Sequence, residues 1–225
     1  MKTSLPALGL ALALPALALP AFAQPAERLE GWTFGEATIF THDPAGPMKV
    51  GRVAADGTLV FEWPSAPSTE QTLALTFPSC NEDGSPIASP GAAEFWPTSL
   101  FIGTDDSVDG ELGSLHLASS PEVVAWQASY GQADAADGTW FQYVHVSQAA
   151  SIEAQCRMPT YTGEGDDQFT QVTEYNVYFE AGWNLMRHDI TRLHAAPSGR
   201  RHAASIRTSV QQGPAKDARW IFRAY

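Results

Sequence analysis

The stretch VGRVAADGTLVFEW, residues 50–63, decides which fold class the sequence predicts. Apolar runs lie on both sides of Asp56-Gly57, and an Asp-Gly pair between two such runs is the strongest short-range signal for a β-hairpin. We therefore expect two antiparallel strands joined by a tight turn at this pair. Runs of the same kind continue in both directions along the chain.

Similar short runs, separated by turn clusters, fill most of the sequence. Residues 71–77, QTLALTF, alternate apolar and polar side chains, which predicts a strand. Residues 122–130, EVVAWQASY, and residues 139–147, TWFQYVHVS, lie on either side of another turn signal, Asp137-Gly138. Further strand-like runs are EATIF, TQVTEYNVYFEA, WNLMRHDI and ARWIFRAY.

Helical periodicity is scarce by comparison. Residues 121–133 are one weak helix candidate, but they are rich in β-branched and aromatic residues and stop at Gly131. Residues 194–207 are another, interrupted by Pro197 and Gly199. Many short strands with Gly, Pro and Asp turns predict an all-β fold, an antiparallel β-sandwich or jelly roll with little helix.

A single domain, residues 24–225, is expected after a leader at residues 1–23. The leader has a basic start, an apolar middle and an Ala-Phe-Ala exit, which is the pattern of a cleaved secretory signal peptide. A membrane anchor is the alternative, although three prolines interrupt the apolar run. We expect a secreted or periplasmic protein whose mature chain has no transmembrane segment. Residues 80–99 predict a long loop, and no internal repeat is present.

The chain has two cysteines, Cys80 and Cys156. In an oxidising compartment such a pair predicts one disulfide, and two free thiols are the alternative. There is no third cysteine and no Cys-x-x-Cys motif. The sequence therefore excludes a zinc ribbon and a thioredoxin-type redox motif.

The charge balance is acidic, with a formal net charge of −12. Nucleic acids and anionic membranes both need a positive footprint, so neither is an expected partner. Arginines nonetheless gather within residues 187–207. A contact site for an anion or an acidic glycan is one interpretation, and pairing with the protein's own carboxylates is the favoured one. The arginines concerned are Arg187, Arg192, Arg200, Arg201 and Arg207.

Residues 178–189, YFEAGWNLMRHD, hold a histidine beside an aspartate and invite an active-site interpretation. The favoured interpretation is a second hairpin, with Ala181-Gly182 as its turn. His188 and Asp189 are neighbours on a strand, so their side chains leave from opposite faces. They therefore cannot form a catalytic His–carboxylate pair with each other.

No motif for a serine-hydrolase elbow, a zinc protease, a phosphate loop or a dinucleotide site occurs, so no catalytic residue is assigned and a non-enzyme is favoured. The run at 104–116, TDDSVDGELGSLH, matches the first half of a calcium loop. Its candidate ligands are Asp105, Ser107 and Asp109. His116 stands where the bidentate glutamate belongs, so an acidic turn is the alternative. Calcium is the only cofactor that the sequence suggests.

Seven tryptophans raise a carbohydrate-binding interpretation, because sugar rings stack on exposed aromatic faces. The alternative destination for most of them is the core, since large aromatics fill sandwich interiors. The tryptophans in or beside predicted strands are Trp96, Trp126, Trp140, Trp183 and Trp220.

The leader followed by LEGWTFG, the hairpin at 50–64, FPSC at 77–80 and YFEAGWNLM at 178–186 together resemble exported bacterial β-rich proteins of unknown function. The resemblance implies no activity and no functional residues. The leading hypothesis is an exported, non-catalytic binding or envelope-associated protein, with a glycan or another protein as its partner. The alternatives are a secreted hydrolase acting on a polysaccharide and a structural or interaction module stabilised by its disulfide.

Overall fold

The computed structural model describes residues 28–43, 46–65, 67, 69, 71–104 and 110–225. Strands account for 54% and helices for 7%, so the prediction of an all-β fold with little helix is confirmed. The elements are β1 (Ala37–Asp43), β2 (Gly46–Val53), β3 (Leu59–Phe61), α1 (Leu73–Thr76), β4 (Ala88–Ser89), β5 (Phe95–Pro97), β6 (Leu100–Gly103), β7 (Glu111–Ala118), α2 (Pro121–Ala128), β8 (Gly138–Val146), β9 (Ala150–Tyr161), β10 (Gln168–Phe179), β11 (Gly182–Ala195), β12 (Arg201–Val210) and β13 (Arg219–Ala224).

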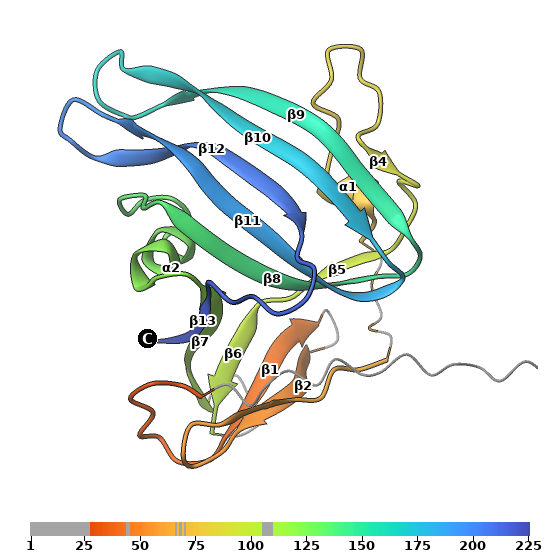
Figure 1. Cartoon of the computed structure of the whole chain (residues 1–225), viewed down its shortest axis with the longest axis vertical. Helices are drawn as coiled ribbons and strands as arrows, with labels where there is room; N and C mark the ends of the chain where they lie inside the picture. Colours follow the sequence, from red (N-terminus) through yellow and green to blue (C-terminus); the bar gives the residue numbers. More distant parts are fainter. Residues whose placement is uncertain (1–27, 44–45, 66, 68, 70, 105–109) are drawn as a thin grey trace, which may run out of the picture.

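All thirteen strands belong to one open, mixed sheet with a sandwich-like arrangement. Its order is β3-β2-β1-β6-β7-β8-β11-β12-β10-β9-β4, with β13 paired to β7 and β5 paired to β8. The long strands β8 to β12 form a curved upper half, and β1, β2, β6, β7 and β13 form the lower half (Figure 1). β7 and β8 join the halves through only two register pairs, Leu117 with Phe141 and Ala118 with Trp140.

The hairpin predicted at residues 50–63 is confirmed. Strands β2 and β3 pair antiparallel, and the amide of Gly57 donates to the carbonyl oxygen of Ala54 at 2.8 Å to close the turn. Gly57 has a φ of +88°, and a Cβ there would lie 2.9 Å from the carbonyl oxygen of Leu29. Glycine is therefore required both by the turn conformation and by the close approach of the neighbouring segment.

The second predicted hairpin, at residues 178–189, is wrong in its pairing. β10 ends at Phe179 and β11 begins at Gly182, as expected, but β12 lies between the two strands. β12 pairs in parallel with β10 and antiparallel with β11. Across the turn, the side chain of Asn184 bonds to both the amide and the carbonyl group of Glu180. The two strands thus splay apart from their turn and admit a strand from later in the chain.

Two segments predicted as strands are helical. Within residues 71–77, Thr72 caps the single turn α1 by accepting a hydrogen bond from the Leu75 amide. Helix α2 has a stronger start, because Ser120 accepts from the Val123 amide and Pro121 occupies the first turn. These capping signals outweigh the β-branched and aromatic content on which the strand predictions rested.

The two segments predicted as irregular or weakly helical are also partly strands. Residues 194–207 complete β11, turn through Gly199 and enter β12, so this segment is a hairpin and not a helix. The expected long loop at 80–99 carries β4 and β5, which pair with β9 and β8.

Each half of the sheet has its own hydrophobic cluster. One packs residues of β1, β2, β3, β6, β7 and β8 against Trp220 of β13. The other packs residues of β8, β9, β10 and β11 against Leu73 of α1. Each half contains large side chains that are fully buried. Phe40 and Ile102 lie in the lower half, and Phe95 lies in the hydrophobic cluster of the upper half.

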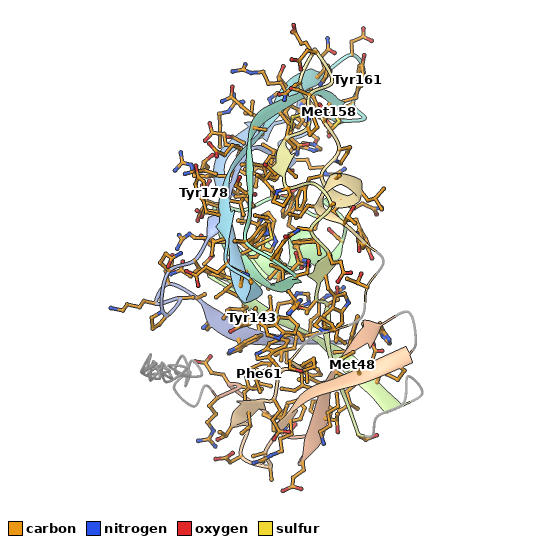
Figure 2. All side chains as sticks on the ribbon, turned by 90° about the vertical axis from the view of Figure 1, so that its right-hand side faces the viewer. Met48, Phe61, Tyr143, Met158, Tyr161 and Tyr178 are labelled. Carbon is orange, nitrogen blue, oxygen red and sulfur yellow. A yellow bond between two sulfur atoms is a disulfide. The ribbon has the colours of Figure 1, made fainter. Side chains whose placement is uncertain are left out.

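Aromatic rings connect the two halves. The ring centroids of Trp63 and Trp183 lie 4.6 Å apart, and the Trp183 indole N–H donates to the carbonyl oxygen of Pro64 at 2.7 Å. Figure 2 places Phe61 and Tyr143 at this junction, where their centroids are 6.3 Å apart. Burial of such rings stabilises the contact between the halves.

The predicted disulfide between Cys80 and Cys156 is confirmed, with a Cα–Cα distance of 5.4 Å. It joins β9 to the segment that follows α1. In the part of the chain that the structure describes, no helix is long and apolar enough to cross a membrane. The proposed leader at residues 1–23 lies outside the described residues.

Candidate functional site

The candidate calcium ligands Asp105, Ser107 and Asp109 lie outside the described residues. Among residues that the structure does describe, no group of three or more His, Cys, Asp or Glu side chains is placed to hold a metal ion. The calcium hypothesis therefore stays a prediction.

A cleft of about 310 Å³ lies next to the place where β7 leaves β8. Its floor comes from three strands that the register aligns, since Ser114 of β7 pairs with Phe101 of β6 and with Arg223 of β13. Directly paired residues share a face of the sheet, and alternate residues return to that face. His116 and Tyr225 therefore join the same floor, and both line the cleft.

Helix α2 forms the wall of the cleft. Val123 and Val124 of α2 are buried in a small cluster with Ala118, against which Trp140 and Ile221 pack. By the same register, Ala118 and Ile221 share the sheet face of Ser114 and His116. Beyond this anchored region, α2 and the residues after it contribute Gln127 and Tyr130 to the cleft. Figure 1 shows α2 beside β8 and above the carboxyl end of β13.

Tyr130 stands at the rim in an unusual backbone conformation. Helix α2 ends with a Schellman motif, in which the Gly131 amide donates to the Trp126 carbonyl and the Tyr130 amide to the Gln127 carbonyl. The position after the cap in this motif is left-handed and is usually glycine. Here it is Tyr130, with a φ of 54°, the one non-glycine residue with positive φ in the described chain. Its side chain is 96% exposed.

A serine and a histidine meet on the cleft floor. The Nε2 atom of His116 lies 2.8 Å from the Oγ atom of Ser114. Burial and, to a smaller extent, the positive charge of Arg223 lower the pKa of His116 to about 4, against the opposing effect of a hydrogen bond with the side chain of Gln127. At neutral pH the imidazole is therefore uncharged, and it presents a hydrogen-bonding edge rather than a charge.

The opposite rim carries Tyr225 and Arg223. Tyr225 is 72% exposed, and its pKa is raised to about 12 by partial burial of its hydroxyl group and by a hydrogen bond to Glu111. Glu111 also lies 3.7 Å from His42. Arg223 is exposed and, within the described chain, makes neither a salt bridge nor a side-chain hydrogen bond. It contributes a free guanidinium group to this rim.

The chemistry available in the cleft is binding more than catalysis. A serine–histidine pair at 2.8 Å has the spacing of a nucleophile and its base. The group that contacts this histidine, however, is the neutral amide of Gln127, which cannot stabilise an imidazolium ion as a carboxylate does. A histidine with a pKa of about 4 is also a weak base at neutral pH.

The neighbours His188 and Asp189 make contacts on opposite faces of β11, as expected. The ring of His188 stacks on Trp140 at 4.6 Å and lies 3.1 Å from the Thr208 hydroxyl. Asp189 points to the other face, where it accepts from Thr139 at 2.6 Å and pairs with Arg187 at 2.8 Å. Each group is used for structure.

Two of the five arginines of residues 187–207, Arg187 and Arg207, pair with the protein's own carboxylates, which is the favoured interpretation. Arg187 also binds Asp217 at 2.9 Å, and Arg207 lies 3.4 Å from Glu174. Arg192 and Arg200 donate to backbone carbonyl groups. Arg223, which lies outside this run, is the arginine that lines the cleft.

The tryptophans offer no exposed platform, since all seven are buried or half-buried. Trp96 and Trp220 lie in the core, with 4% and 6% of their surface exposed. The exposed aromatics at the cleft are instead the two tyrosines, Tyr130 and Tyr225, which the sequence analysis did not single out. The only signal was a Tyr-Gly pair directly after a capped helix.

Comparison with known proteins gives no relative from which a role could be transferred. No protein-family model, no curated protein and no solved structure matches this chain.

Proposed function

We propose that this protein is an exported, non-catalytic binding protein that holds a saccharide in the cleft between α2 and the β6–β7–β13 floor. The observation that carries the proposal is the pair of exposed tyrosines at the rim, one of them kept in a conformation that glycine usually occupies. Strained backbone of this kind concentrates at ligand-binding sites, where it presents a side chain that the ligand needs.

The lining suits a hydroxyl-rich ligand. Ser99, Ser114, Gln127 and Gln142 supply donors and acceptors, and the neutral His116 adds a further polar edge. Tyrosine rings present an apolar face and a polar tip, which matches the alternating apolar and hydroxyl faces of a sugar ring. A cleft of about 310 Å³ lies at the small end of the usual range for ligand sites.

Export rests on the leader-like residues 1–23 and on the Cys80–Cys156 disulfide, since disulfides persist in oxidising compartments. A secreted or periplasmic location is part of the proposal.

Calorimetric titration of the purified protein with a panel of oligosaccharides tests the proposal. Tyr130→Ala and Tyr225→Ala are each expected to weaken binding of the best ligand by about tenfold or more, because buried aromatic contacts dominate such interfaces. The matched control is Tyr161→Ala, which removes a tyrosine that is 70% exposed at the far end of the molecule from Tyr143, a cleft residue (Figure 2). Equal effects of all three substitutions, or no binding to any saccharide, would refute the proposal.

The second candidate function is hydrolysis, favoured by the contact between Ser114 and His116. If it holds, the protein releases reducing ends or acyl groups from a glycan, and Ser114→Ala abolishes that release. A wild-type protein that binds a saccharide and returns it unchanged excludes this candidate.

A further inference from the structure

The ionisable groups of the cleft do not follow the composition of the chain. The protein has 25 acidic and 13 basic residues, yet none of the described residues that line the cleft is an aspartate or glutamate. The lining contains one arginine, Arg223, and one histidine that is neutral at pH 7. Among the described side chains that line the cleft, Arg223 is therefore the one that carries a charge at neutral pH.

The carboxylate that contacts the rim residue Tyr225 is already engaged. Glu111 is 11% exposed, accepts a hydrogen bond from the Tyr225 hydroxyl and faces His42 at 3.7 Å. The described chain contains no salt bridge to Arg223, so the Glu111 carboxylate lies more than 4 Å from the Arg223 guanidinium. Other arginines of the acidic surface, such as Arg187 and Arg219, have found carboxylate partners. Arg223 therefore keeps its full set of donors for a ligand.

From these contacts we infer that the cleft selects an anionic saccharide, whose carboxylate or sulfate group binds Arg223 while its sugar ring lies between Tyr130 and Tyr225. The inference rests on the proposed function and names its ligand class. The guanidinium fork matches the planar geometry of a carboxylate and donates two parallel hydrogen bonds to it. His116, kept neutral, adds no competing charge.

The test compares a galacturonate trimer with its fully methyl-esterified form, which keeps the sugar rings and removes the charge. Calorimetry is expected to show the acid binding at least about tenfold more tightly than the ester. Arg223→Gln is expected to remove this preference, and Arg223→Lys is expected to retain part of it. A sulfated trisaccharide of equal charge distinguishes the two oxyanions, and tighter binding of either one upholds the inference.

The matched control is Arg219→Gln, on the same strand and also exposed, which changes the net charge equally but does not line the cleft. If this control weakens binding of the acid as much as Arg223→Gln does, the effect is a general charge effect and the inference is wrong. If ester and acid bind equally while Tyr130→Ala weakens both, the inference is wrong but the proposed function stands. If neither ligand binds although another saccharide of the panel does, the inference is wrong and the proposed function stands, whereas if no saccharide binds at all, both are wrong.

Discussion

Replacing Tyr130 with glycine separates the stability of the fold from the binding function of the cleft. A left-handed conformation costs an ordinary L-residue about 1–2 kcal/mol, and glycine avoids that cost. Glycine also has more freedom in the unfolded chain, which offsets about 0.4–1 kcal/mol of the gain. The ring of Tyr130 is 96% exposed, so its removal loses almost no buried surface. The balance is an increase of about 0.5–1 kcal/mol in the free energy of unfolding.

In a domain of this size such a gain raises the melting temperature by about 1–4 °C. Tyr130→Ala keeps the Cβ atom and hence the backbone cost, so its melting temperature should stay near that of the wild type. Gly131→Ala, with a φ of +77° one residue later, should shift the melting temperature down. Thermal unfolding followed by circular dichroism, with urea titration as an independent measure, gives these values.

Saccharide titration completes the experiment. Tyr130→Gly and Tyr130→Ala should lose the same binding affinity, although only the glycine variant becomes more stable. Two results would refute the reasoning: a glycine variant no more stable than the alanine variant, or a stabilised glycine variant that binds as well as the wild type. The first would show that Tyr130 carries no conformational cost, and the second that the cost has no function.

The remaining predictions concern acid stability, the disulfide and the floor of the cleft. Burial lowers the pKa of His188 to about 4. The neutral ring therefore contributes about 3 kcal/mol to the free energy of unfolding, which is present above pH 6.5 and is lost as the pH falls towards 4. Urea titrations across this pH range should show a smaller loss of stability for His188→Gln than for the wild type. The double substitution of Cys80 and Cys156 by serine opens a link across a sequence separation of 76 and should cost about 4 kcal/mol, measured by the urea midpoint of the oxidised protein and the variant. In Gly113→Ala the new Cβ would lie about 2.2 Å from the carbonyl oxygen of Arg223, so β13 must move; a loss of about 1–3 kcal/mol and weaker saccharide binding are expected, and unchanged calorimetry would contradict this.

The parts of the fold that the sequence predicted are those in which local signals agree with their surroundings. Asp56-Gly57 encodes its turn within four residues, and the neighbouring strands pair with each other. Ala181-Gly182 encodes a turn equally well, but the two flanking strands do not pair with each other. Both pair with β12, which lies about 20 residues further along the chain. No pattern within residues 178–189 contains that information.

The cleft was beyond prediction for a related reason. Phe101, Ser114 and Arg223 become neighbours only through the register of three strands, and no motif links them in the sequence. Helix α2 carried a usable signal, since Ser120-Pro121 is a strong helix start. Once a helix is assigned there, Tyr130-Gly131 stands out as a departure from the glycine that usually takes the first position after a helix cap.

The placement of β12 also constrains the order in which a growing chain can fold. Synthesis proceeds from the amino end, so β8, β9, β10 and β11 are all made before residues 201–210 exist. Until those residues emerge, β10 and β11 each expose an unpaired edge, and β7 lacks its β13 partner. A nascent chain stopped at residue 200 should therefore remain sensitive to protease. The open sheet is therefore completed in its middle, when β12, one of the last segments to leave the ribosome, pairs with β10 and β11.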